Sequence, residues 1–107
     1  MSILEVSIAE LEAAMQAGAL VVDVRETDEY VSGHVPGAVH VALGTVPDHV
    51  DAFRSDGATY VICRSGARSM RACEFLAEQG LDVVNVAGGT LAWVDGGRAV
   101  VTGSSPL

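Results

Sequence analysis

The chain has 107 residues, half of them apolar, and a formal net charge of −8 at neutral pH. This length suits one domain that folds around its own core, and the apolar fraction is too high for a disordered segment. The negative charge argues against nucleic acid or an anionic membrane as a partner, because both attract lysine and arginine.

The first third of the chain alternates apolar runs with helical patterns. We expect a short strand over residues 3–6, a helix over residues 8–17 and a buried strand over residues 20–24. A short helix over residues 27–31 should follow, with Thr27 as its N-cap and acidic side chains in its first turn. A turn rich in glycine then leads into the middle of the chain.

The middle of the chain contains its clearest strand and its clearest helix. Residues 38–41 predict a short strand, and residues 46–53 predict a weak helix. A β-branched and aromatic run over residues 59–62 predicts a central strand that ends directly before Cys63. The strongest helical pattern follows over residues 67–79 and is ended by a glycine.

The last part of the chain adds a strand over residues 82–86 and a short helix around residues 91–94. Strands that alternate with helices favour parallel pairing. The sequence therefore predicts an α/β fold with a central parallel sheet of about five short strands and helices on both faces. We expect one domain over residues 1–101 and a flexible C-terminal tail over residues 102–107.

Cys63 lies beside the main cluster of positive charge in this acidic chain. Three of the six arginines, Arg64, Arg68 and Arg71, lie within eight residues just after it, and the sequence contains no lysine. Residues 58–72 contain no aspartate or glutamate. A solvated surface run is the plain alternative, but the local charge also suits the binding of an anion beside a thiol.

The position of Cys63 between a strand end and a helix start favours a reactive thiolate. Functional groups of open parallel sheets lie beyond the carboxyl ends of the strands. The amides of a tight loop and the dipole of the following helix attract negative charge, and Gly66 lets the backbone curl. Together with the nearby cations, these groups should lower the pKa of the Cys63 thiol and make it a nucleophile without a histidine base. The alternative is an inert, buried cysteine.

Three stretches of the sequence resemble the signatures of the rhodanese family. They are residues 22–38 with VDVR, EY and GHVPGA, residues 63–69 with CRSGARS, and residues 86–93 with VAGGTLAW. On this resemblance, the chain is identified as a member of the single-domain rhodanese family, the thiosulfate sulfurtransferases. The resemblance implies a rhodanese-like fold.

The resemblance also implies a chemistry. Cys63 would take the outer sulfur of thiosulfate or a persulfide donor as its own persulfide and pass it to a thiophilic acceptor. That acceptor would be cyanide in an assay and a thiol or a protein cysteine in the cell. The substrate-binding residues would be those of the loop, with charge from the two arginines and no metal or organic cofactor: Arg64, Ser65, Gly66, Ala67 and Arg68.

Further polar residues are assigned supporting roles. In the family, the positions of Asp23, Arg25 and Glu29 brace the active loop through an ion pair and hydrogen bonds, so we expect structural support rather than acid–base catalysis. Ser69 is placed in the same supporting set and offers a hydroxyl donor near the thiol. Cys73 falls on the apolar face of the helix after the loop, and a core thiol is favoured over a resolving cysteine.

Three histidines, His34, His40 and His49, could suggest a metal site. Their spacings match no common zinc arrangement, and neither cysteine adds a plausible ligand. We therefore predict no metal and assign these histidines to structural hydrogen bonding.

Two other functions stay open. A non-catalytic rhodanese-like interaction or regulatory module is one, although such modules often lack the cysteine or the cationic loop that this chain has. A phosphatase or arsenate reductase of related fold is the other. Four residues separate Cys63 from Arg68, whereas those enzymes use a loop one residue longer, so the short loop favours sulfur. The sequence also lacks the acid that a phosphatase needs to protonate its leaving group.

The sequence also bears on location. It has only two cysteines and no run of 18 apolar residues, and its first residues lack the pattern of a signal peptide. We therefore expect a soluble protein of the cytoplasm.

Overall fold

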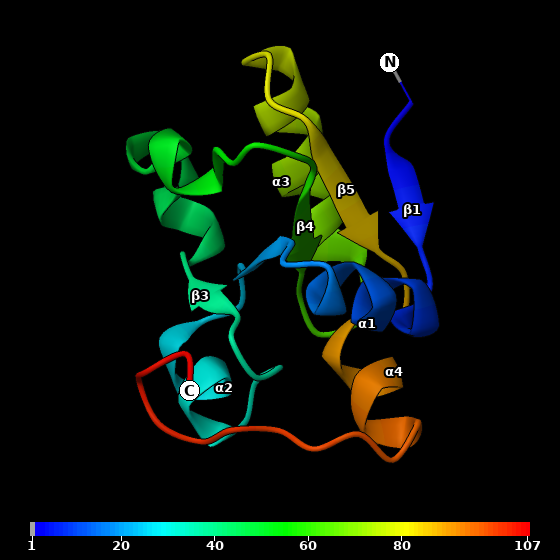
Figure 1. The fold of residues 1–107 in the computed structure, drawn as a ribbon. Coiled ribbons are helices and arrows are strands. Elements are labelled where there is room, and N and C mark those ends of the chain that lie inside the picture. Colours follow the sequence, from blue (N-terminus) through cyan, green and yellow to red (C-terminus); the bar gives the residue numbers. More distant parts are fainter. Residues whose placement is uncertain (1) are drawn as a thin grey trace.

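A computed structural model describes residues 2–107 of the chain. Its centre is a sheet of five strands in the order β1-β5-β4-β2-β3, and every pair is parallel (Figure 1). The predicted α/β fold with a parallel sheet is thus confirmed. The strands are β1 (Leu4–Val6), β2 (Leu20–Asp23), β3 (Val39–His40), β4 (Thr59–Ile62) and β5 (Val83–Val86).

The helices lie close to their predicted positions. They are α1 (Ile8–Gln16), α2 (Thr27–Ser32), α3 (Ala67–Glu78) and α4 (Gly89–Asp95), with the two 3-10 helices η1 (Leu43–Asp48) and η2 (Val50–Phe53). The weak helix expected over residues 46–53 is thus split, and Pro47, which lacks an N–H donor, lies inside η1. The expected N-cap at Thr27 is wrong by one residue, because Glu26 takes that position.

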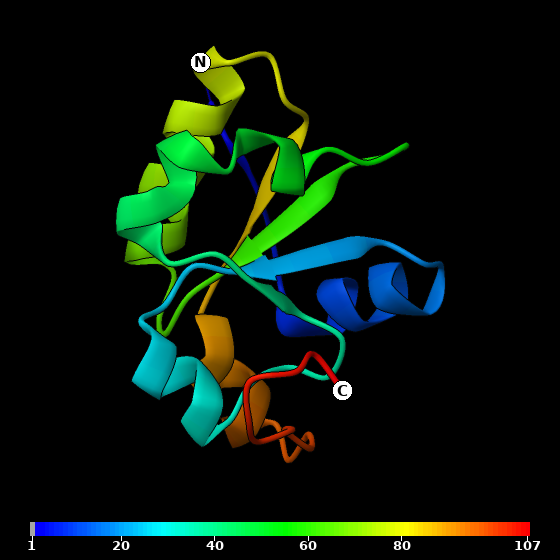
Figure 2. The same ribbon diagram turned by 90° about the vertical axis from the view of Figure 1, so that its left-hand side faces the viewer.

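Helices cover both faces of the sheet (Figure 2). Val61 of β4 faces a core shared with α3 and the 3-10 helices, whereas Ile62 faces a core shared with α1 and α4. Both faces of the central strand are therefore buried, which explains why its sequence is an apolar run without alternation.

The C-terminal residues pair with the turn that follows α2 (Figure 1). His34 and Val101 exchange two backbone hydrogen bonds of 2.9 Å each, and the amide of Gly37 donates to the carbonyl of Pro106. The ring Nε2 of His34 lies 3.0 Å from the carbonyl oxygen of Ser105. The tail over residues 102–107, which was expected to be flexible, thus has hydrogen-bond partners more than 60 positions earlier in the sequence. None of the helices in residues 2–107 is long and apolar enough to cross a membrane.

Candidate active site

The topology places Cys63 at the middle of the carboxyl edge of the sheet. Cys63 directly follows β4, which lies between β2 and β5. Asp23, the last residue of β2, is paired in register with Ile62. The residues that follow these three strands therefore meet around the sulfur, as is typical of sites in parallel sheets.

The loop after Cys63 turns back on the sulfur before α3 begins. Gly66 adopts a left-handed conformation with φ of +111°, which lets its amide point at the thiol. The Gly66 nitrogen lies 3.1 Å from Cys63 Sγ, and the hydroxyl of Ser69 lies 3.3 Å from the same sulfur. Ser69 is fully buried, so its hydroxyl is shielded from water and available to the sulfur.

These hydrogen bonds shift the ionisation of the thiol. Burial by itself raises the pKa of Cys63, but the hydroxyl of Ser69 and the amides of Ser69, Gly66 and Ser65 lower it more. The pKa of Cys63 therefore lies below its ordinary value, which favours the thiolate. Hydrogen-bond donors cause this shift, whereas the sequence suggested the neighbouring arginines as an additional cause.

Ser69→Ala should make the Cys63 thiolate harder to form. The variant loses the hydroxyl donor but keeps the helix, so the pKa of Cys63 rises and the rate of alkylation by iodoacetamide at neutral pH falls several-fold. The rate measured against pH should have the same plateau at high pH, with its midpoint moved upward. An unchanged midpoint would exclude Ser69 as the donor that stabilises the thiolate.

Arg68 is bound by an acidic side chain from another element. Its Nη1 lies 2.7 Å from Glu29 Oε1 and its Nη2 lies 2.9 Å from Glu29 Oε2, so the ion pair is bidentate. The hydrogen bonds with Arg68 lower the pKa of Glu29 to about 2, so the carboxylate is charged at neutral pH. Arg68 was expected to supply positive charge for binding the sulfur donor. In the structure, the negative charge of Glu29 balances it.

Asp23 and Arg25 form a second, buried pair beside the loop. The two side chains are joined at 2.9 Å between Arg25 Nη2 and Asp23 Oδ2, and the same nitrogen donates to the carbonyl of Gly33 at 2.7 Å. Only 6% of Arg25 is exposed, and Asp23 is fully buried. The pair thus ties the end of β2 to the turn after α2. The ion pair expected between these positions is present, and its bracing role stays a prediction.

Comparison with known proteins identifies the family. A family model, the rhodanese-like domain, matches residues 7–95. The chain belongs to the rhodanese-like family.

Individual proteins resemble this rhodanese-like chain over most of its length. It is 42% identical over 95 residues to YtwF of Bacillus subtilis (strain 168), covering 87% of this chain and 92% of YtwF. It is 38% identical over 84 residues to the thiosulfate sulfurtransferase GlpE of Pseudomonas putida (strain GB-1), covering 78% and 76% of the two chains. A rhodanese-like domain protein from Staphylococcus aureus superposes with a TM-score of 0.84 at 31% identity, covering 94% of this chain and 98% of the other.

The start of α4 holds the candidate active loop of this rhodanese-like domain, residues 63–68, in place. The amide and the hydroxyl of Thr90 both donate to the carbonyl of Cys63, at 2.9 and 3.0 Å. The amide of Leu91 donates to the carbonyl of Arg64 at 3.0 Å. These bonds turn the loop carbonyls toward α4 and away from the sulfur. From the sequence, residues 86–93 were used for the family resemblance, and this contact was missed.

Asn85 is a second residue that sequence reasoning missed. It lies fully buried in β5 and donates from Nδ2 to the carbonyl of Gly66 at 3.1 Å and to Glu5 Oε2 at 2.8 Å. Its Oδ1 is buried and has no hydrogen-bond partner within residues 2–107. The sequence did contain a signal for this residue, namely a single amide side chain in an otherwise apolar strand.

Cys73 is separate from this chemistry. It is fully buried on the core-facing side of α3, and burial raises its pKa to about 12. A thiol in that state does not ionise near neutral pH and reacts slowly. Its placement agrees with the expectation of a core thiol. Within residues 2–107, no three His, Cys, Asp or Glu side chains gather as a possible metal site.

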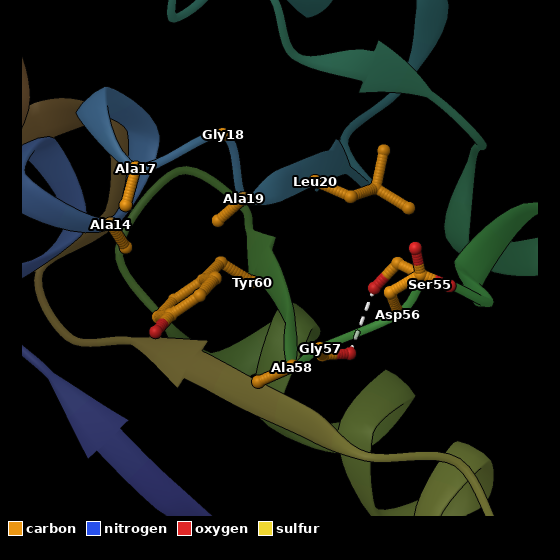
Figure 3. Close-up of a pocket in the computed structure, with 10 residues that line it drawn as sticks. All are labelled: Ala14, Ala17, Gly18, Ala19, Leu20, Ser55, Asp56, Gly57, Ala58 and Tyr60. Atoms are coloured by element: carbon orange, nitrogen blue, oxygen red, sulfur yellow. Dashed lines mark hydrogen bonds between the residues drawn. The ribbon is translucent and has the colours of Figure 1, made fainter.

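Among the cavities formed by residues 2–107, two lie at opposite ends of the sheet. The larger, about 600 Å³, lies at the amino ends of β2 and β4, where Tyr60 is surrounded by small side chains such as Ala14 and Ala58 (Figure 3). It lies at the end of the sheet opposite to Cys63, and neither cysteine lines it. The second, about 240 Å³ and named here the α4 groove, lies beside the active loop; its lining includes Arg25, Glu29, Arg64, Thr90, Leu91 and Val94.

Proposed function

We propose that this protein is a sulfurtransferase that carries sulfur as a persulfide on Cys63. The observation that supports this function most directly is the cradle around the sulfur, in which the Gly66 amide and the Ser69 hydroxyl donate to Sγ. The same donors suit a Cys63 persulfide anion. Its negative charge lies mainly on the outer sulfur, one atom beyond Sγ. The name of the GlpE relative indicates thiosulfate as one donor of this family.

The first half of the reaction loads the cysteine. The Cys63 thiolate attacks the outer sulfur of the donor, a new S–S bond forms, and the old bond from that sulfur to the rest of the donor breaks. The leaving group departs with the bonding electron pair, as sulfite from thiosulfate or as a thiolate from an organic persulfide. The lowered pKa of Cys63 supports this step because the attacking species is already deprotonated.

The second half of the reaction unloads the cysteine. A thiophilic acceptor, cyanide or a thiolate, attacks the outer sulfur of the Cys63 persulfide and takes it, which restores the thiolate. The amides of residues 64–68 would hold the charge in both halves, which is electrostatic stabilisation without proton transfer. Every electron pair comes from the donor, the cysteine or the acceptor, so no metal or organic cofactor is required.

Mass spectrometry of the loaded protein tests this function. After incubation with thiosulfate or an organic persulfide, the peptide that contains Cys63 should gain the mass of one sulfur atom, and cyanide should remove it as thiocyanate. The peptide that contains Cys73 provides the internal control and should stay unmodified, because that thiol is buried and its pKa is raised. If neither donor adds sulfur to Cys63, the protein is not a sulfurtransferase, and a non-catalytic interaction module becomes the better interpretation.

A further inference from the structure

The charges around the active loop are nearly balanced before any donor binds. Glu29 binds both terminal nitrogens of Arg68, and Asp23 binds Arg25. Arg64 is exposed, and within residues 2–107 it forms no ion pair. Arg71 is also exposed and without an ion pair in these residues, but it lines a different cavity with Leu43 and Phe75. The α4 groove therefore offers a donor one unbalanced positive charge, that of Arg64, besides the loop amides.

Thiosulfate is poorly matched to this charge. It is a dianion, and its approach brings two negative charges toward a cysteine that must itself be a thiolate. With Arg64 as the one unpaired cation of residues 2–107 that lines the α4 groove, repulsion between donor and nucleophile is only partly offset. The form of an organic persulfide that a thiolate attacks is the protonated one, whose reacting end is neutral, so repulsion at the reacting sulfur is smaller.

The α4 groove is shaped for a donor with an organic body. Leu91 and Val94 of α4 are 42% and 50% exposed and form the apolar part of its wall. Arg64 lines the same groove, and its carbonyl accepts a hydrogen bond from the Leu91 amide, so the cation and the apolar wall are adjacent. A small molecule with an apolar chain and one carboxylate complements both features, whereas thiosulfate has no apolar part.

We infer that the preferred sulfur donor is an organic persulfide with one carboxylate, and that Glu29 sets this preference by binding Arg68. This inference rests on the proposed sulfurtransferase function. The Cys63 thiolate attacks the outer sulfur of the persulfide, and the donor's S–S bond breaks with its electron pair passing to the departing thiolate. The proton of the outer sulfur ends on that thiolate, so the products are the donor thiol and the Cys63 persulfide anion.

Glu29→Gln provides the central test because it frees the charge of Arg68 without removing the side chain. The glutamine oxygen can still accept the hydrogen bond that Glu29 takes from the Glu26 amide at 3.0 Å. The ion pair is partly exposed, so its loss should cost little stability. Asp28→Asn is the matched control: it removes one negative charge from the same turn, at an exposed residue that forms no ion pair within residues 2–107.

The measurement is the second-order rate of Cys63 persulfide formation in a single turnover, followed by mass spectrometry. The donors are thiosulfate, the persulfide of N-acetylcysteine, and the persulfide of N-acetylcysteine amide, which lacks the carboxylate. Each rate is divided by the rate of the same donor with free mercaptoethanol thiolate, so that intrinsic reactivity cancels. Thermal melting of each variant shows whether its fold is intact.

On this normalised scale, the wild-type protein should favour N-acetylcysteine persulfide over thiosulfate by about tenfold or more. Glu29→Gln should raise the thiosulfate rate by about tenfold and leave the persulfide rate nearly unchanged, and Asp28→Asn should change neither. Arg64→Gln should slow the carboxylate-bearing persulfide by a larger factor than the amide persulfide.

Three results would overturn the inference: a wild-type preference for thiosulfate, an equal response of both donors to Glu29→Gln, or no response of the thiosulfate rate. A failure of the proposed function looks different, because then neither donor adds sulfur to Cys63 in any variant.

Discussion

Cys63→Ser is expected to abolish sulfur transfer and leave the fold intact. A serine hydroxyl is a far weaker acid than a thiol, so no nucleophile forms near neutral pH, and an oxygen cannot carry the sulfur as a persulfide. The rate of thiocyanate formation from thiosulfate and cyanide should fall by at least about 10³-fold, as when a covalent nucleophile is removed from other enzymes. The Gly66 amide and the Ser69 hydroxyl, which contact Cys63 Sγ, can still donate to the serine oxygen.

The matched control for this prediction is Cys73→Ala. Cys73 is fully buried and its pKa is raised to about 12, so its removal should change stability slightly and leave the rate of sulfur transfer near the wild-type value. The two variants together separate chemistry from folding. Thiocyanate formation by a folded Cys63→Ser protein would show that Cys63 is not the sulfur carrier.

Gly89→Ala is expected to distort the active loop, because Gly89 of α4 packs against the backbone of that loop. Gly89 has φ of +58°, and a Cβ atom added there would lie 2.5 Å from the carbonyl oxygen of Arg64 and 2.6 Å from that of Cys63. Both neighbours are backbone, so either α4 or the active loop must move. The left-handed conformation and the close contact should together lower the free energy of unfolding by about 3 kcal/mol.

The activity of Gly89→Ala should also fall, because α4 holds the loop through Thr90 and Leu91. We expect sulfur transfer to be at least about tenfold slower even at temperatures where the variant is fully folded. Gly97→Ala is the control: Gly97 has φ of +78°, but a Cβ atom there meets nothing within 4 Å. It should lose only about 1 kcal/mol and keep its activity. If urea unfolding and kinetics give the same result for both variants, close packing at Gly89 does not explain its conformation.

Local sequence patterns were sufficient for the elements that carry the site. The run at residues 59–62 predicted β4 with its observed bounds, and the helical pattern after Cys63 predicted α3 to within one residue. These patterns are reliable because burial on both faces of a central strand requires an apolar run, and a surface helix requires a regular apolar stripe. The loop between them followed from the position of Gly66, which has the left-handed conformation that glycine adopts most easily.

Local patterns were less informative for the short and irregular elements. The weak helix at residues 46–53 became two 3-10 helices, and the strand expected at residues 38–41 has two residues, Val39–His40. The tail at residues 102–107 was expected to be flexible, yet its backbone pairs with residues after α2. In each case the outcome depends on packing partners that lie far away in the sequence.

The sequence by itself determined that a thiol, an arginine and a glycine lie between a strand and a helix, with two more arginines in the first half of that helix, because these residues are neighbours along the chain. Only the tertiary structure decided how their charges are used. Glu29 lies 39 positions before Arg68, and the fold brings the two within 2.7 Å, so the charge of Arg68 is balanced before a donor arrives. Asn85 and Thr90 likewise reach the loop from other elements. Ion pairs and hydrogen bonds depend on distance in space, and that distance is set by the order of the strands and the way the helices pack on them.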